Sequence, residues 1–358
     1  MKSKLIKIDF TNKKIIVGLD VHSKTWYATI IIEEVLTTKT FVADPKKLAE
    51  YLKTNYPLGD YIVGYEAGCF GFWIKEELEA LGITVIVINP ADIPTTDKDK
   101  KSKTDKIDSK KLALGIKSGL VKGIYAPDRQ SQEYRGLSRR RQDITKKLTR
   151  VKNQIKATLK YYGIGYPDEY SDNQKHWSNN FIKWLATLKF KTSYGTEKME
   201  SYLRELLFLR TEKLNILRQL RKLSTEEKFK KECKILRSIP GIGIVSAIIF
   251  MTEIVEIGRF KSRDEFLSYI GLSPNEHSSG EKRKIGHMTK RCNHSLRTIF
   301  IESAWIAIRK DPALTNYYNE TYKKTGKSKA IIKVAKKLAA RARYILINNT
   351  EYVIGVAA

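Results

Sequence analysis

The fold of this 358-residue chain is decided by the stretch Lys14-Ile15-Ile16-Val17-Gly18-Leu19-Asp20-Val21-His22. It is a short apolar run rich in β-branched residues, which is typical of a buried strand, and it carries the carboxylate of Asp20 at its C-terminal end. Ligand and metal sites of α/β sheets gather at the carboxyl ends of strands. Asp20 is therefore placed where a chemical site is expected.

Around this strand, residues 1 to about 125 alternate predicted strands and helices. Two more strands come before the first helix, which predicts an antiparallel start. In chain order, the further elements are strands at 26–32 and 37–42, a helix from Asp44-Pro45 to 52, a strand at 61–66, a helix at about 70–81 and a strand at 84–88. This order predicts an α/β domain with a mixed five-stranded sheet covered by helices.

Three further acids occupy places like that of Asp20. Glu66 ends a predicted strand, and Asp105 and Asp108 lie on one face of a predicted helix that Thr104 can cap. Four carboxylates close together repel one another, and a pair of divalent cations removes that repulsion. Oxygen ligands suit Mg²⁺, so these acids predict a two-metal site that acts on phosphate groups. The alternative is that each acid only ends a strand or caps a helix.

A long helix is predicted at 133–160. Its apolar residues recur at steps of three, four and seven, as in a coiled coil, and its other face is strongly basic. The residues of this face that we expect to contact nucleic acid are Arg139, Arg140, Arg141, Lys147 and Arg150. A second apolar helix contains Leu203, Leu207, Leu214, Leu217 and Leu220. The two helices either pair antiparallel as a stalk or associate with another copy of the protein.

The last part of the chain, from about residue 234, is predicted to be compact and mostly helical. The stretch Ile239-Pro240-Gly241-Ile242-Gly243 looks like the turn of a helix-hairpin-helix, whose exposed backbone N–H groups hold a DNA phosphate. An ordinary connection between two helices would use Gly241 and Gly243 for backbone reasons alone. Both interpretations stay open at this point.

A polar loop rich in Gly, Ser and Lys is predicted at 277–289. A serine in such a loop can attack phosphorus while neighbouring cations neutralise the developing charge. The cations in and after the loop are Arg283, Lys284, Lys290 and Arg297. From the residues alone, the simpler interpretation is a loop that binds phosphates without forming a covalent bond.

The composition indicates a polyanionic partner. Lys and Arg number 67 against 39 Asp and Glu, which gives a net charge of +28. Such an excess implies nucleic acid or an anionic membrane, and the lack of an apolar run long enough to span a bilayer favours nucleic acid. Three widely spaced cysteines fit a reducing cytosol. We therefore expect a cytoplasmic protein without membrane contact or a disulfide framework.

Together, these stretches resemble the DEDD transposases of the insertion-sequence family "one-ten", which are bridge-RNA-guided DNA recombinases related to the Piv-type DNA invertases. In the RuvC-like half, which has an RNase H fold, the resemblance rests on residues 18–22, 66–67 and 103–108. In the transposase half it rests on residues 239–243, 271–274, 279–283 and 296–297. The order and separation of these short motifs make the resemblance specific.

The resemblance implies that Asp20, Glu66, Asp105 and Asp108 form a DEDD cluster that holds Mg²⁺. It also implies that Ser279 is the nucleophile that joins covalently to DNA, with the adjacent serine at 278 as the alternative. Members of the family use a structured non-coding guide RNA that pairs with donor and target DNA. They act as tetramers, with active sites shared between the RuvC-like half of one subunit and the serine half of another.

We therefore predict a RuvC-like domain at 1–128, a helical coiled-coil region at 129–228 and a small, mostly helical transposase domain at 229–358. The predicted function is RNA-guided, Mg²⁺-dependent recombination of double-stranded donor and target DNA by a homo-oligomer, dimer to tetramer, at the nucleoid of a bacterium or archaeon. Two alternatives remain. One is a RuvC-like nuclease that makes no covalent intermediate, and the other is a non-catalytic nucleic-acid-binding protein.

Overall fold

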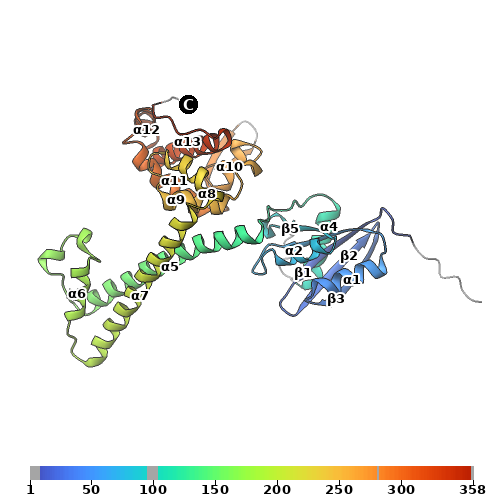
Figure 1. The fold of residues 1–358 in the computed structure, drawn as a ribbon, viewed down its shortest axis with the longest axis horizontal. Coiled ribbons are helices and arrows are strands. Elements are labelled where there is room, and N and C mark those ends of the chain that lie inside the picture. Colours follow the sequence, from blue (N-terminus) through green and yellow to red (C-terminus); the bar gives the residue numbers. More distant parts are fainter. Residues whose placement is uncertain (1–8, 95–103, 280–281, 356–358) are drawn as a thin grey trace, which may run out of the picture. The chain divides into compact units, whose positions relative to one another are not determined.

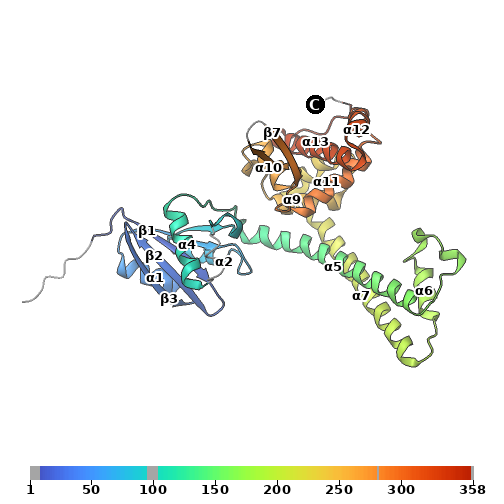
Figure 2. The same cartoon turned by 180° about the vertical axis from the view of Figure 1, so that it is seen from behind.

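A computed structural model describes residues 9–94, 104–279 and 282–355, and leaves the side chains of 275–287 undescribed. The chain divides into two compact units, Met1–Arg129 and Gln130–Ala358, which Figure 1 and Figure 2 show from opposite sides. Each unit has a hydrophobic core of its own. The predicted border at 228/229 within the second unit stays a prediction.

The first unit contains a five-stranded mixed sheet. Its strands are β1 (Lys14–Val21), β2 (Thr25–Ile32), β3 (Val35–Val42), β4 (Asp60–Glu66) and β5 (Thr84–Ile88). They lie in the order β3-β2-β1-β4-β5. The β1–β2 and β2–β3 pairs are antiparallel, whereas β1–β4 and β4–β5 are parallel. The predicted mixed sheet with an antiparallel start is confirmed, and the opening strand lies at its centre.

Helices cover both faces of this sheet. Because strand residues alternate between faces, Leu19 and Tyr65 point to one side, where they are buried with residues of α1 (Pro45–Asn55) and α2 (Trp73–Ala80). The other side carries α4 (Asp105–Lys117). A Cβ on Gly18 would lie 2.1 Å from the backbone oxygen of Ser109 on α4. The bare backbone at this position thus lets α4 lie directly on β1.

The second unit begins with two long helices, α5 (Arg129–Tyr161) and α7 (Ser193–Leu223), which cross each other in the view of Figure 1. A short helix, α6 (Asn179–Thr187), packs against α7. The predicted apolar stripe on α5 is confirmed by five buried residues, Ile144, Leu148, Val151, Ile155 and Leu159. They share one hydrophobic core with α7, as expected for a helical stalk.

The predicted stripe on α7 is partly wrong. Leu203 and Leu220 are buried, but Leu207 is 49% exposed and Leu214 is 53% exposed. The buried residues between them are offset from the predicted ones, and they include Leu206, Leu209 and Ile216. Leucines occur on several sides of this helix, so spacing alone did not identify the side that faces the core.

The rest of the second unit is a mostly helical bundle. Its helices are α8 (Glu227–Arg237), α9 (Ile244–Ile254), α10 (Arg263–Tyr269), α11 (His294–Ala307), α12 (Pro312–Thr325) and α13 (Lys327–Asn348). Apolar residues of α8, α9, α11 and α13 form its core. None of the helices in the described part of the chain is both long and apolar enough to cross a bilayer.

The segment predicted as a polar loop at 277–289 is instead mostly a hairpin. Strands β6 (Pro274–Ser279) and β7 (Lys282–Met288) pair antiparallel, with Ser278 opposite Arg283 and Ser279 opposite Lys282. The expected loop was wrong because this sequence lacks the apolar alternation by which strands are recognised. Backbone hydrogen bonds, which do not depend on apolar side chains, build this hairpin.

Candidate metal centre and nucleic-acid contacts

Three side chains with metal-binding atoms meet at the end of β1. One ligand atom each from Asp20, His22 and Asp105 lie within 4.8 Å of one another. Asp20 ends the buried run of β1, and Asp105 is the first residue of α4, whose N-cap Thr104 accepts a hydrogen bond from the Ile107 N–H. Two segments that are 85 positions apart in the sequence are thus brought together because α4 packs on β1.

The other two predicted acids lie on the same face of the sheet. A Cβ on Gly64 would meet Ile116 of α4 at 2.3 Å, so even-numbered residues of β4 face α4, and Glu66 is one of them. Glu66 also follows directly after Tyr65, which pairs with Leu19 of β1. Asp108 lies one turn after Asp105 on α4 and is in electrostatic contact with Asp20. All four acids therefore share one face and one end of the sheet.

The charge balance at Asp20 is unfavourable for an isolated carboxylate. Its side chain is 23% exposed. Burial, followed by the negative charges of Asp105 and Asp108, raises the pKa of Asp20, although His22 opposes this effect. Functional sites commonly contain such a carboxyl group, whose charged form is disfavoured by burial and by neighbouring like charges.

His22 was not among the predicted site residues. Its Nε2 lies 3.3 Å from Oδ2 of Asp20 and 3.6 Å from Oδ2 of Asp105. The signal was present in the sequence, because His22 follows Asp20 by two positions, directly after the predicted strand, where strand alternation continued by one residue would put both side chains on one face.

The donors fit a divalent cation. Carboxylate oxygens on one rigid face are the ligands that Mg²⁺ and Mn²⁺ prefer, whereas imidazole nitrogen suits softer metals. His22 is therefore better suited to hydrogen-bond and orient the two carboxylates than to bind the ion itself. Lys111 lies with its Nζ 3.7 Å from Oδ1 of Asp108 and supplies a nearby positive charge.

The predicted serine lies in the second unit. The backbone places Ser279 at the end of β6, opposite Lys282, and Arg283 and Lys284 on β7. The side chains of these residues lie outside the described part. Lys290 is exposed just after β7. Arg297 donates from Nη2 to the backbone oxygen of Thr289, which ties α11 to the end of the hairpin.

The two glycines of the predicted helix-hairpin-helix turn differ. Gly241 has a φ of +91°, and a Cβ there would lie 2.8 Å from the backbone of Ser303 on α11, so its glycine is needed for packing. Gly243 is exposed at the N-terminus of the eleven-residue helix α9, and a Cβ added to it would have no neighbouring atom within 4 Å. The close approach of Gly241 supports a structural role, and only Gly243 has open space beside it.

The cations predicted on α5 fall into two groups. Arg140, Lys147 and Arg150 are exposed, while Arg141 is half-buried. Arg139 instead donates from Nε and Nη2 to the carboxylate of Glu253, at 2.9 and 3.0 Å. That carboxylate is almost completely buried and also accepts a hydrogen bond from Asn293, which caps α11. Arg139 thus has an internal partner that its sequence position did not reveal.

Sequence profiles of known families match both units. A DEDD transposase profile of the IS110 type matches residues 17–164, and a profile described as "Transposase IS116/IS110/IS902 family" matches residues 233–319. The first contains all four predicted acids, and the second contains the serine hairpin.

Curated relatives agree with these matches. The protein y4qE of Sinorhizobium fredii, described as a candidate transposase, is 27% identical over 67% of this chain and 57% of its own length. A second candidate transposase of that organism, y4rJ, is 29% identical over 77% of this chain and 74% of its own length. The transposase for insertion sequence element IS1111A of Coxiella burnetii is 26% identical over 80% and 75%, respectively. The chain thus spans less than two thirds of the first relative and about three quarters of the other two.

Proposed function

This chain belongs to the IS110/IS116 family of insertion-sequence transposases, and on that premise we propose that it is a Mg²⁺-dependent, RNA-guided DNA recombinase with a covalent serine–DNA intermediate. The observation that supports this proposal most is that Asp20 of β1 meets Asp105 of α4, with Asp108 nearby, on the face of the sheet toward which Glu66 of β4 also points. Acids that only ended strands or capped helices would have no reason to share that face.

Asp20, Glu66, Asp105 and Asp108 would hold the cation. A bound divalent cation polarises a DNA phosphate and helps a hydroxyl nucleophile to lose its proton. The fold supplies rigidity, because the backbone of β1 and the first turn of α4 are held by the close packing at Gly18. His22 keeps Asp20 and Asp105 in position by lying within reach of both carboxylates.

Ser279 is the proposed nucleophile. Its Oγ forms an ester bond with a backbone phosphorus while the bond from that phosphorus to one strand-end oxygen breaks, and the departing oxygen takes up a proton. The phosphoserine ester conserves the energy of the cut phosphodiester, so the strand can be rejoined to another end without an external energy source. Arg283 and Lys284 on the same hairpin are the proposed phosphate contacts.

Nucleic acids are the proposed partners, as double-stranded donor and target DNA and a structured guide RNA. Exposed cations on α5 (Arg140, Lys147 and Arg150), together with Lys290 and the N-terminus of α9 at Gly243, are the proposed contacts outside the two chemical sites. We further propose a homo-oligomer, dimer to tetramer, in the cytoplasm at the nucleoid.

A covalent trapping assay tests the chemistry. Full-length protein, purified with the RNA it retains, is incubated with end-labelled DNA from the borders of its own element in the presence of Mg²⁺. We expect a labelled protein–DNA adduct that survives detergent and is removed by protease. The adduct is expected to be absent for Ser279→Ala and for Asp20→Asn.

Two matched variants serve as controls. Ser278→Ala changes the neighbouring serine, and Glu77→Gln removes an exposed acid from α2, on the opposite face of the sheet. Both are expected to form the adduct. If Ser279→Ala still cuts DNA without an adduct, the protein is a RuvC-like nuclease. If it still forms the adduct and Ser278→Ala does not, Ser278 is the nucleophile.

Sequencing of the retained RNA tests the guide. We expect one structured species, encoded beside the transposase gene, with two loops that match donor and target DNA. A mixture of unrelated cellular transcripts would contradict RNA guidance while leaving the serine chemistry untouched.

A further inference from the structure

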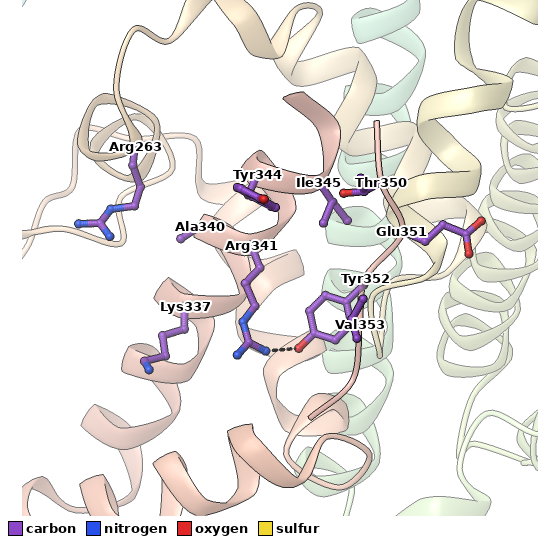
Figure 3. Close-up of a pocket in the computed structure, with 10 residues that line it drawn as sticks. All are labelled: Arg263, Lys337, Ala340, Arg341, Tyr344, Ile345, Thr350, Glu351, Tyr352 and Val353. Atoms are coloured by element: carbon purple, nitrogen blue, oxygen red, sulfur yellow. Dashed lines mark hydrogen bonds between the residues drawn. The ribbon is translucent and has the colours of Figure 1, made fainter. Parts of the chain in front are cut away.

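Two adjoining cavities lie along α13 in the second unit. Their volumes are about 740 and 370 Å³, and both are lined by Arg263 of α10 and by Lys337 and Ala340 of α13. We call the combined depression the α13 groove. Its larger cavity, drawn in Figure 3, is bounded on one side by the segment that follows α13, at Thr350–Val353.

The groove is strongly positive. Lys333 and Lys336 join Arg263 and Lys337 along its narrower part. The helix itself contains no acid from Lys327 to Asn348. Within the described part of the chain, no carboxylate lies within ion-pair distance of the three lysines, whereas Nε of Arg263 lies 3.6 Å from Oδ1 of Asp264. The single acid in the lining, Glu351, has its own partner, because Nζ of Lys234 lies 3.5 Å from it.

Cations that gather on one face without counter-charges repel one another, which favours an anionic occupant. Residues 333, 337, 340 and 344 follow the spacing of one helical face, so the lysines and the apolar wall belong to one continuous surface. The spacing of these lysines along a helix suits a run of phosphates better than one compact anion.

The wall of the larger cavity is apolar and aromatic. It includes Ala340, Ile345, Val353 and Tyr344, the last of which is 64% exposed. Nearby, Nζ of Lys337 lies 4.0 Å from the ring centroid of Tyr317. Exposed aromatic rings beside cations are the arrangement on which unpaired nucleobases stack, and a cavity of this volume is within the range of about 300–1,000 Å³ that holds small organic groups.

The inner wall is rigid. Arg341 donates from Nη1 to Oδ2 of Asp311 at 3.1 Å, and the hydroxyl of Tyr352 donates to the same oxygen. Figure 3 shows the Arg341 and Tyr352 side chains joined by a hydrogen bond, with Lys337 and Arg263 extending away from Tyr352. This network pins the segment after α13 against the helix, so the cavity exists before any ligand binds.

We propose that the α13 groove binds a single-stranded segment of DNA, with its phosphates along Lys333, Lys336, Lys337 and Arg263 and an unstacked base against Tyr344. A duplex keeps its bases stacked, so it could use the cations but not the apolar cavity. The choice of DNA as the occupant rests on the proposed function, because strand exchange leaves DNA strands transiently unpaired. None of these residues belongs to the carboxylate or serine sites, so the proposal goes beyond the function given above.

Equilibrium binding tests the proposal directly. Full-length protein, freed of nucleic acid at high salt and kept in EDTA so that no cleavage occurs, is titrated into a labelled single-stranded oligothymidylate, its duplex with oligoadenylate, and the matching oligouridylate. The variant Lys333→Gln/Lys336→Gln/Lys337→Gln removes three groove charges. The control Lys323→Gln/Lys324→Gln/Lys329→Gln removes three exposed charges from α12 and α13 outside the groove.

For single-stranded DNA, we expect the groove variant to bind at least about ten-fold more weakly than the control. The slope of log affinity against log salt is expected to fall by about 2, since each single-strand phosphate contact contributes about 0.7. Equal losses in the two triple variants would overturn the proposal, and so would equal losses on duplex and single strand. A groove-dependent loss confined to the RNA strand would replace DNA by RNA as the occupant.

The role of Tyr344 gives an independent readout. Tyr344→Ala is expected to weaken single-strand binding about ten-fold through lost stacking, while Tyr344→Phe retains it within about two-fold. A single-stranded oligonucleotide that carries 5-iodouracil is expected to crosslink on irradiation to the peptide that contains Tyr344. Crosslinks found only in other peptides would contradict the assignment of the groove.

Discussion

Two carboxylates in this protein, Asp20 in the first unit and Asp311 in the second, are withdrawn from water in opposite ways. The partner found for Asp20 is His22, and its other close neighbours, Asp105 and Asp108, are acids. Asp311 is completely buried and accepts hydrogen bonds from Tyr352, Arg341 and the backbone N–H groups of Ala313 and Gly355.

The pKa values follow from these surroundings. Burial and like charges raise the pKa of Asp20. Burial by itself would also raise the pKa of Asp311, but the hydrogen bonds from Tyr352 and the backbone outweigh it, and the pKa is lowered. A buried acid with a full set of donors stabilises a fold. An acid gathered with other acids is stabilised by a bound cation, so this difference supports the proposed functional role of Asp20 and a structural role for Asp311.

The largest expected effect comes from Asp20→Asn. If Asp20 holds the metal, DNA cleavage falls at least about 1,000-fold, which corresponds to about 4 kcal/mol of transition-state stabilisation. Since its pKa is raised in the folded state, its charge opposes folding, and the melting temperature is expected to stay equal or rise. Cleavage rates and thermal melts of the same preparation measure both. A large drop in melting temperature would show that Asp20 stabilises the fold and would contradict its contrast with Asp311.

Asp311→Asn is expected to lower the stability of the fold and to leave DNA cleavage nearly unchanged. It removes a charge that compensates the partly buried Arg341, so we expect a loss of about 3 kcal/mol in the free energy of unfolding. Urea denaturation, followed by fluorescence, measures it. At a temperature where the variant is folded, DNA cleavage is expected to remain within about three-fold of wild type. A variant as stable as wild type would contradict the structural role.

Metal binding is expected to distinguish Asp20 from Asp311 as well. A divalent cation that binds only the folded protein stabilises it by about 2.7 kcal/mol at 100 times its dissociation constant. We expect Mg²⁺ or Mn²⁺ to raise the melting temperature of wild type and of Asp311→Asn, but not of Asp20→Asn. Chelation with EDTA reverses the shift. An equal shift in all three proteins would place the cation elsewhere.

The smallest effect is a pH dependence. The pKa of Asp311 is lower in the folded than in the unfolded state, so its charge stabilises the fold above about pH 4, and this contribution is lost as the pH falls through the folded pKa. The difference in unfolding free energy between wild type and Asp311→Asn is therefore expected to shrink below about pH 4. A difference that is constant from pH 7 to pH 3 would contradict this assignment.

Much of the first unit could be predicted from its sequence. The apolar run at β1 identified the central strand, and Asp20, Glu66, Asp105 and Asp108 were identified by their places at the ends of strands and at the start of a helix. These signals are local, because strand and helix periodicities are repeated within a few residues. In the second unit, the hairpin of β6 and β7 could not be predicted in this way. Its strands pair through backbone hydrogen bonds, and its polar side chains show no alternation of apolar and polar residues.

The sequence by itself and the tertiary structure determined different features of this protein. The sequence alone determined the strands and helices of the sheet domain, the basic stalk helix and the identity of the acids, because each of these is encoded by neighbouring residues. Only the tertiary structure decided which face the acids share, that His22 joins them, and that Arg139 is bonded to Glu253. The reason is that α4 lies on β1 through the missing side chain of Gly18, and close packing of segments so far apart leaves no periodic signal in the sequence.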